Sequence, residues 1–177
     1  MNKKYYVKIE LSNDKVINLC LLEKHAPQSV NQFVELVKKN FYDGTVFHRI
    51  IDNFMIQTGG YKIQDNALVE LKGVKTIKGE FKSNGFDNTL KHELGVISMA
   101  RTNDKNSATS QFFICAADCE WLDGEYAAFG VAVDEESKEV VKEVSKMQTF
   151  APHPMFTDFP TEEISIRTLV LEKEEEE

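Results

Sequence analysis

The sequence of 177 residues is poor in cysteine, in excess positive charge and in long apolar runs. Its three cysteines, Cys20, Cys115 and Cys119, are an odd number in a chain that is long enough to bury a core without disulfides. We therefore predict reduced thiols. Cys115 and Cys119 are four residues apart, but no Cys/His pair elsewhere completes a zinc-ligand set, so the metal interpretation is weak. No cofactor is expected.

The charge and the apolar runs exclude two further classes of protein. The formal net charge is −8 and the pI is about 5.1, and the lysines and arginines are scattered, which argues against binding to a phosphate backbone. No continuous apolar segment follows the first residues, and no run is long enough to cross a bilayer. We predict a cytoplasmic protein that binds neither nucleic acid nor membrane.

The apolar pattern predicts eight short strands and two helices. The strands are expected at 6–11, 16–22, 46–51, 54–57, 95–100, 111–115, 127–133 and 164–172, where apolar residues alternate or cluster. Helices are expected at 27–39, with Val30, Phe33, Val34 and Val37 on one stripe, and at 135–147, with Val140, Val141 and Val144 inward. This content predicts an all-β fold, a closed or nearly closed antiparallel barrel, rather than βαβ units.

The chain is long enough for one domain, which we place at residues 1–172. Residues 173–177 are acidic, and we expect a frayed, solubilising tail. Two long segments, 59–89 and 101–110, are expected to be loops that are either functional or disordered. No coiled-coil seam is evident, so a monomer is the default.

An unusual mixture of residues marks the candidate site. Arg49 and Gln57 stand among large apolar residues in the run 47–57, and Gln111 is placed similarly in the run 110–115. An apolar surface with a few convergent polar groups is typical of a small ligand site. The natural guest is an apolar molecule with an amide to be gripped.

Ordinary structural roles compete with this interpretation. Core packing is the default for Phe47, Phe112 and Phe113, and neighbours in a strand face opposite ways, so at least one of Phe112 and Phe113 belongs to the core. A lone histidine such as His48 is more often structural than catalytic. Arg49 is the exception, because an arginine in an apolar run needs a reason, so a functional and a structural role both stay open.

Four motifs carry a family resemblance that spans nearly the whole chain. They are Phe47–Ile51 with Phe54–Gln57, Ser98–Arg101, Ser107–Phe113 and Trp121–Gly124. These motifs resemble those of the cyclophilin-type peptidyl-prolyl cis-trans isomerases, and the bacterial cytosolic members in particular. The resemblance implies an eight-stranded barrel capped by two helices, with an active groove on its outer face and proline-containing peptides and folding proteins as substrates.

The resemblance also implies a role for each site residue. Arg49 is the catalytic residue, and it donates to the prolyl nitrogen. The other site residues bind the substrate. The proline pocket consists of Phe54, Met55, Phe113 and Leu122, and the residues that hydrogen-bond the peptide are Gln57 and Gln111. Ala100 and Arg101 offer main-chain contacts, and Trp121 and Tyr126 form an aromatic rim. Trp121 stands where family members contact substrate and the macrocycle cyclosporin.

The chemistry of this reaction explains why an arginine suffices without a cofactor. Rotation about an X-Pro bond crosses a barrier of about 20 kcal/mol but breaks no bond, so no nucleophile or proton shuttle is required. The twisted prolyl nitrogen becomes a hydrogen-bond acceptor, and a guanidinium aimed at it stabilises the twisted state selectively. A catalysed rate of about 10–10³ s⁻¹ requires that the barrier be lowered by roughly 4–7 kcal/mol, and one donor lowers it by about 3–4 kcal/mol. A dry pocket must supply the rest.

The sequence departs from the family pattern at three places. Tyr126 stands where many members carry histidine, and Arg101 where many eukaryotic members carry asparagine. The segment 61–79 lacks the glycine-rich loop that is common in the family. Because Tyr126 keeps an aromatic wall and offers a hydroxyl, we expect an altered substrate preference rather than lost activity.

Two other functional classes stay open beside the isomerase. One is a binding module or chaperone that grips proline-containing segments without turnover. The other is a small-molecule-binding barrel or a hydrolase, which has poor support because Ser98, Ser107 and Ser110 lie in no nucleophile-elbow motif.

Overall fold

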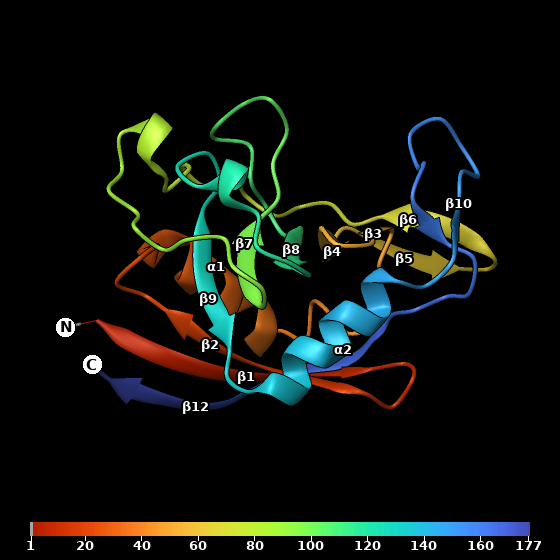
Figure 1. Cartoon of the computed structure of the whole chain (residues 1–177), viewed down its shortest axis with the longest axis horizontal. Coiled ribbons are helices and arrows are strands. Elements are labelled where there is room, and N and C mark those ends of the chain that lie inside the picture. Colours follow the sequence, from red (N-terminus) through yellow and green to blue (C-terminus); the bar gives the residue numbers. More distant parts are fainter. Residues whose placement is uncertain (1) are drawn as a thin grey trace.

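The centre of the molecule is an eight-stranded antiparallel sheet in the order β12-β1-β2-β9-β7-β8-β4-β3 (Figure 1). Its strands are β1 (Lys3–Leu11), β2 (Val16–Leu22), β3 (Arg49–Ile51), β4 (Met55–Thr58), β7 (Val96–Met99), β8 (Phe112–Cys115), β9 (Ala128–Ala132) and β12 (Ile166–Glu176). The structure, a computed structural model, describes residues 2–177. The eight predicted strands are confirmed as elements, each with its ends shifted by a few residues or none.

The predicted strand at 46–51 is shorter than expected. Strand β3 begins at Arg49, because the preceding residues pair elsewhere. The Phe47 N–H donates to the Ile164 carbonyl at 2.9 Å, and the Ile166 N–H donates to the Thr45 carbonyl at 2.8 Å. The backbone just before β3 therefore bonds to the backbone around the start of β12, at the opposite end of the strand order.

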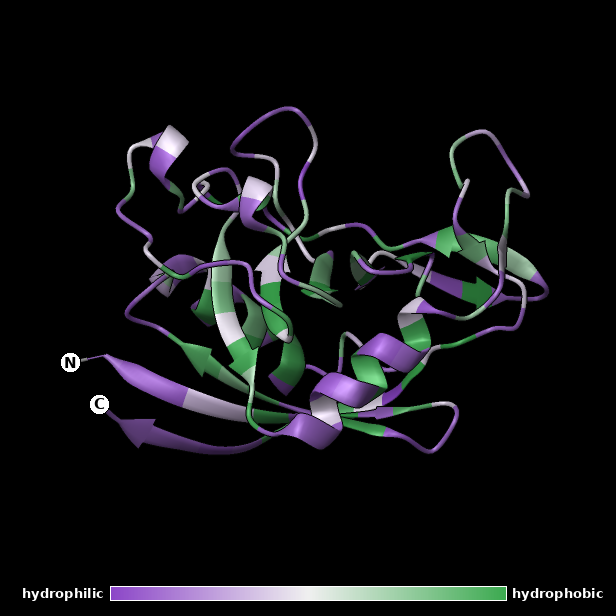
Figure 2. Cartoon of the chain, in the orientation of Figure 1, coloured by the Kyte–Doolittle hydropathy of each residue, from purple (hydrophilic) through white to green (hydrophobic). Residues whose placement is uncertain are grey.

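Both predicted helices are present, and each buries the expected stripe. Helix α1 (Pro27–Lys38) packs against β2, β9 and β12, and helix α2 (Glu135–Ser145) packs against β2, β3, β4 and β9. Val30, Phe33, Val34 and Val37 of α1 and Val140, Val141 and Val144 of α2 are buried. Figure 2 shows the hydrophilic face of α2 turned away from the sheet. Amphipathic spacing alone was enough to predict these faces.

The predicted frayed tail is wrong. Residues 173–176 continue β12 and pair with β1, with Lys3 opposite Glu176 and Lys4 opposite Glu175. Opposite charges support this pairing, since the Lys3 ammonium lies 3.4 Å from the Glu174 carboxylate. The two ends of the chain consequently lie side by side (Figure 1). The acidic composition of the tail indicated a solvated end. Composition could not reveal the pairing, because it carries no information about a partner strand about 170 residues away.

The long segment at 59–89 is also more ordered than a loop. It contains a hairpin of β5 (Tyr61–Gln64) and β6 (Ala67–Glu70) and a short 3₁₀ helix, η1 (Lys82–Asn84). Asp65 and Asn66 join the two strands with φ angles of 51° and 64°. Two successive residues with positive φ are the geometry of a tight two-residue hairpin turn, which Asp and Asn tolerate well. The segment at 101–110, by contrast, contains no helix or strand.

Three small elements complete the chain. The 3₁₀ helix η2 (Glu120–Leu122) follows β8, and the two-residue strands β10 (Thr149–Phe150) and β11 (Phe159–Pro160) pair with each other. The chain between β10 and β11 projects beside the β5–β6 hairpin in Figure 1.

Glu80, in the segment after β6, completes the start of α1. The N-cap residue of α1, Ala26, has no side chain that could accept a hydrogen bond. Instead the buried Glu80 carboxylate accepts the Gln28 N–H at 3.0 Å, the Ser29 N–H at 2.7 Å and the Ser29 hydroxyl at 2.8 Å. A carboxylate at a helix N-terminus also interacts favourably with the helix dipole. Glu80 therefore attaches a long segment to the helix.

We expect Glu80→Ala to lower the free energy of unfolding by about 2–3 kcal/mol, because two backbone N–H groups lose a charged acceptor. Glu80→Gln keeps one oxygen but turns an amide donor toward the same N–H groups, so it should give a partial loss. Urea unfolding of the three proteins measures the difference. Equal stability of Glu80→Ala and wild type would show that the cap contributes nothing.

Candidate active site

Alternate residues of the central strands belong to two separate hydrophobic clusters. Along β4, β7 and β8, one set joins the main core and the other joins a smaller cluster on the opposite face. The smaller cluster consists of Met55, Val96, Phe113, Cys115, Cys119, Leu122 and Ala128. Ile56, Ile97, Phe112 and Ile114, which lie between these positions, pack in the main core. The period of two therefore builds a second apolar surface without weakening the first.

This division confirms that Phe112 and Phe113 face opposite ways. Phe112 is fully buried in the main core, and Phe113 lies at the centre of the smaller cluster. The Tyr126 ring meets Phe113 edge-on at 5.8 Å between centroids. The rings of Phe54 and Trp121 contact each other at the outer edge, with 5.6 Å between their centroids, and Trp121 is 60% exposed. Phe113 thus lies in an apolar cluster whose outer edge, at Trp121, reaches solvent.

A buried histidine supports Phe113 from behind. His92 stacks on Phe113 at 6.1 Å. Its Nε2 lies 2.8 Å from the Ser98 hydroxyl, and its Nδ1 lies 3.0 Å from the Asp123 carboxylate. Burial lowers the pKa of His92, although the Asp123 carboxylate opposes that shift. Sequence reasoning missed His92, because a single histidine in a loop gives no sign of its distant partners.

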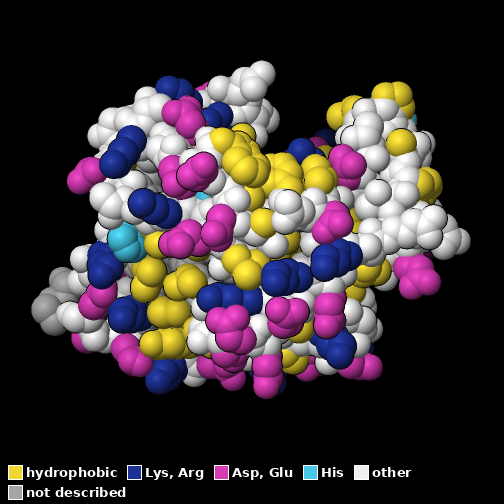
Figure 3. Space-filling view, viewed as in Figure 1, with side chains coloured by type: hydrophobic (Ala, Val, Ile, Leu, Met, Phe, Trp, Pro, Cys, Tyr) yellow, Lys and Arg dark blue, Asp and Glu magenta, His cyan; other side chains and the backbone are white. Residues whose placement is uncertain are grey.

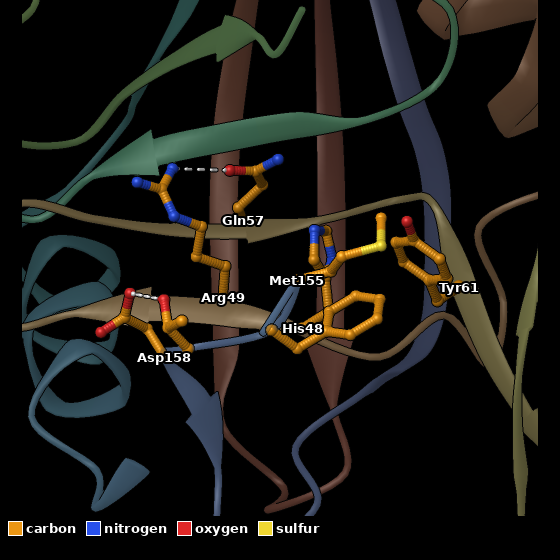
Figure 4. Close-up of a pocket in the computed structure, with 8 residues that line it drawn as sticks. His48, Arg49, Gln57, Tyr61, Met155 and Asp158 are labelled. Carbon is orange, nitrogen blue, oxygen red and sulfur yellow. Dashed lines mark hydrogen bonds between the residues drawn. The ribbon is translucent and has the colours of Figure 1, made fainter. Parts of the chain in front are cut away.

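A chain of hydrogen bonds holds Arg49 at the rim of the pocket. Arg49 and Gln57 are directly opposite on β3 and β4, and the Arg49 Nη1 donates to the Gln57 Oε1 at 3.3 Å (Figure 4). The Gln57 Nε2 donates to the Gln111 Oε1 at 2.9 Å. The Arg49 guanidinium also lies 5.9 Å from the centre of the Phe54 ring. The side chain is exposed but held in place on the pocket side.

Gly60 makes room for the last member of this chain. A Cβ at residue 60 would lie 2.5–2.6 Å from three side-chain atoms of Gln111, a separation that real Cβ atoms do not show. The glycine therefore lets Gln111 pack flat against the backbone after β4 and reach Gln57.

A hollow lies beside Gln57 and Gln111. A cavity of about 170 Å³ is lined by Gln57, Gln111, Ala100, Arg101 and Thr109, with Thr102 and Ser107 at its edge. The space-filling view shows the surface hollowed between the loops around β7 and β8 and the segment around β10, with hydrophobic side chains along the floor (Figure 3). The structure thus brings Gln57, Ala100, Arg101 and Gln111 to one hollow, and it places Met55, Phe113 and Leu122 in the smaller cluster, with Phe54 and Tyr126 packed against that cluster. Arg49 and Trp121 both lie against the Phe54 ring.

The comparisons with known proteins agree with this geometry. A family model described as cyclophilin type peptidyl-prolyl cis-trans isomerase/CLD matches residues 6–170. The chain belongs to the cyclophilin family. The resemblance that the motifs indicated is therefore confirmed.

Two bacterial proteins and two solved structures of one further protein illustrate how similar this cyclophilin is to its relatives. It is 41% identical to peptidyl-prolyl cis-trans isomerase A of Dickeya dadantii, over 86% of this chain and 77% of that protein. It is 33% identical to peptidyl-prolyl cis-trans isomerase B of Escherichia coli, over 82% and 87%. A cyclophilin from Cryptosporidium parvum shares the fold with a TM-score of 0.74 at 23% identity, covering 98% of this chain and 99% of that one. The same protein was also solved in the presence of the dipeptide Ala-Pro. That structure matches with a TM-score of 0.73, covering 95% of this chain and 99% of that one.

Two residues at which this cyclophilin departs from the family pattern contact each other. The Arg101 guanidinium lies over the Tyr126 ring at 4.6 Å and over the Phe81 ring at 4.9 Å. It also donates to the Glu125 carbonyl from Nε at 3.1 Å and from Nη2 at 2.7 Å. The Arg101 side chain therefore fixes the wall of the pocket that Tyr126 forms. The Ala100 N–H donates to the Gln111 carbonyl at 3.0 Å, so that amide is already used within the sheet.

His48, next to Arg49, is 6% exposed and its Nδ1 has no hydrogen-bond partner. Burial and the neighbouring Arg49 charge lower the pKa of His48 to about 4. The imidazole is consequently neutral at neutral pH, which suits the structural role that the sequence indicated better than proton transfer.

Within residues 2–177, no three His, Cys, Asp or Glu side chains gather in a way that could hold a metal ion, and no helix has the length and apolarity to span a membrane.

We expect the stability of this cyclophilin to fall as pH drops from about 6.5 to 4. In the unfolded chain His48 takes up a proton near its ordinary pKa of about 6.5, whereas in the folded protein it stays neutral down to about pH 4. Acid therefore favours the unfolded state, by up to about 3 kcal/mol. Thermal unfolding between pH 7.5 and 4 measures this loss. His48→Gln should show a shallower fall, and parallel curves for both proteins would contradict the assignment.

Proposed function

We propose that this cyclophilin isomerises X-Pro peptide bonds by directing the Arg49 guanidinium at the prolyl nitrogen while the proline ring rests on Phe113. The observation that carries the proposal is the position of Arg49, fixed through Gln57 and Gln111 at the rim of the apolar cluster. Phe54, Met55 and Leu122 supply the remaining walls of the proline pocket. The Ala-Pro dipeptide in the Cryptosporidium parvum structure supports a proline-containing substrate.

The charge acts on the twisted state more than on the planar one. A planar amide nitrogen shares its lone pair with the carbonyl, so it accepts no hydrogen bond. Rotation localises that lone pair, and the guanidinium donates to it. Because the interaction arises only in the transition state, it raises kcat. The guanidinium acts as a hydrogen-bond donor, so no proton transfer is needed.

The hydrogen-bond chain supplies preorganisation. A free arginine loses rotamer freedom when it binds, whereas Arg49 is already held by the Gln57 Oε1. One preorganised donor contributes about 3–4 kcal/mol. Exclusion of water from the Phe113 floor strengthens that interaction and lowers the barrier further. We therefore assign Gln57 to positioning Arg49 as well as to contact with the peptide.

Exchange NMR on an Ala-Pro peptide tests the function. We expect catalytic amounts of the purified chain to accelerate cis–trans exchange, which takes tens of seconds without catalysis. A folded protein that binds the peptide but leaves the exchange rate unchanged would be a binding module instead.

We further propose that cyclosporin binds over Trp121. The indole is 60% exposed at the rim of the proline pocket, against Phe54. Its fluorescence should change on addition of the macrocycle in a saturable way. A silent titration would show that this rim does not accept cyclosporin.

Three finer features belong to the same proposal. The backbone bonds between the segments 45–47 and 164–166 support a barrel that is closed between β3 and β12. A monomeric domain and a cytoplasmic location are the state and place we propose for the enzyme.

A further inference from the structure

A cavity separate from the proline pocket lies on the other side of Arg49. Its volume is about 270 Å³, and it lies between His48 and Arg49, Tyr61 of β5 and the segment from Met155 to Asp158 (Figure 4). None of Phe54, Met55, Phe113 or Leu122 lines it. Arg49 and Gln57 line it, and Gln57 also lines the hollow beside Gln111. Because Arg49 is the residue that we propose to contact the prolyl nitrogen, the cavity lies next to the position of the residues that flank that proline.

The far wall is attached firmly to the strand that carries Arg49. The Ile50 N–H donates to the Asp158 carbonyl at 3.0 Å, immediately beside the catalytic residue. Phe156 meets the Tyr61 ring edge-on at 5.3 Å, and His48 meets Tyr61 at 4.8 Å. Three rings thus pack against one another around the cavity, while Met155, which is 77% exposed, forms a flexible edge. Aromatic walls and a thioether suit an aromatic guest.

A polar group that lines this site lacks a partner. His48 lines the cavity and is 6% exposed, and its Nδ1 is shielded on all sides. Its other ring nitrogen, Nε2, is not shielded in this way and has no hydrogen-bond partner among the described residues. A mostly buried polar atom gains from a hydrogen-bond partner. A hydroxyl can either donate or accept, so it satisfies an imidazole nitrogen in either tautomer.

The charged and the aromatic parts of the lining are separate. Figure 4 shows Arg49 and Asp158 on the same side, away from His48 and Tyr61, and the Asp158 carboxylate accepts the Thr157 hydroxyl at 3.1 Å. The aromatic part of the lining therefore offers an uncharged surface to a guest. The volume is slightly below that of small-molecule sites, about 300–1,000 Å³, and suits one large side chain.

We propose that this cavity is a specificity subsite for a tyrosine side chain on a residue that flanks the substrate proline. The ring packs against Tyr61 and Phe156, and the phenol hydroxyl bonds to the His48 Nε2. The inference rests on the proposed isomerase function, whose reaction it narrows to a class of sequence.

A set of peptides tests the proposal by exchange NMR. Each peptide carries Ala, Phe or Tyr at one of four positions, the two before the proline and the two after it. At one position we expect Tyr to raise kcat/KM about tenfold over Ala and to exceed Phe several-fold. Phe156→Ala should bring the Tyr-to-Ala ratio close to one. His48→Leu should remove the advantage of Tyr over Phe but keep the preference for an aromatic ring. Phe150→Ala, an aromatic truncation on the same segment but outside the cavity, should keep both ratios.

The outcomes separate the subsite from the enzyme. If the wild type turns over the Ala peptides but treats Ala, Phe and Tyr alike at all four positions, the subsite is wrong and the isomerase stands. The subsite is also wrong if the preference survives Phe156→Ala in a protein whose thermal unfolding shows that it is folded. If no peptide is turned over, the proposed function fails and the subsite fails with it.

Discussion

Replacement of Arg49 by alanine should lower kcat/KM on an Ala-Pro peptide by about 10²–10³-fold without unfolding the protein. The loss corresponds to the roughly 3–4 kcal/mol that one preorganised donor contributes to a transition state. The fold should survive, because the side chain is exposed and the main core lies on the other face of the sheet. Exchange NMR gives the rate, and thermal unfolding gives the stability.

Two further variants identify the source of the effect. Arg49→Lys keeps the charge but loses the planar fork that bonds to Gln57, so its rate should fall between those of Arg49→Ala and wild type. Arg167→Ala removes an exposed arginine that pairs with Glu10 and Asp14 and lines neither hollow beside Arg49 and Gln57, so it should leave the rate unchanged. A rate for Arg49→Ala within twofold of wild type would remove the guanidinium from the mechanism.

Phe113→Ala should lower kcat/KM roughly 30- to 150-fold, because the proline loses its apolar floor. Burial of one large apolar side chain is worth about 2–3 kcal/mol, and here it acts on the substrate. The smaller cluster that contains Phe113 is separate from the main core, so most of the structure should remain intact.

The adjacent residue is the matched control. Phe112 is fully buried in the main core, where it meets Phe33 edge-on at 5.2 Å. Phe112→Ala should cost about 3–5 kcal/mol of unfolding free energy while the folded fraction stays active. Phe112→Leu gives the same comparison with a milder loss if the alanine variant does not fold. The site assignment is wrong if the two positions exchange these effects.

The sequence was most informative where one local pattern decides the structure. Helix stripes such as Val30, Phe33 and Val37 and the opposite facing of Phe112 and Phe113 follow from spacing alone, and both are confirmed. The site was also predictable because its residues lie in motifs that resemble a family. The hairpin turn at Asp65–Asn66 also carries a local signal, two turn-forming residues between short segments.

The remaining features depend on contacts between distant residues. Nothing local to Glu80 indicates that it caps a helix 51 residues away, and nothing local to Arg101 indicates that its side chain fixes Tyr126. Likewise, the Gln57 carboxamide bonds to Arg49 and Gln111 only because three strands place them together. Such pairings need coordinates, because single-sequence patterns describe periodicity and not neighbours.

The acidic end of β12 has a consequence for how copies of this protein meet. The start of β12 bonds to the segment 45–47, whereas residues 173–176 pair only with β1 among the described strands and form a free edge at one end of the strand order. Residues 172–177 contain five glutamates. An edge strand with free backbone groups invites another chain to add itself as a further strand. Two such edges brought together would place rows of carboxylates against each other, and like charges that face each other across strands are destabilising. The same residues that complete the sheet within one molecule therefore protect it from aggregation at high concentration.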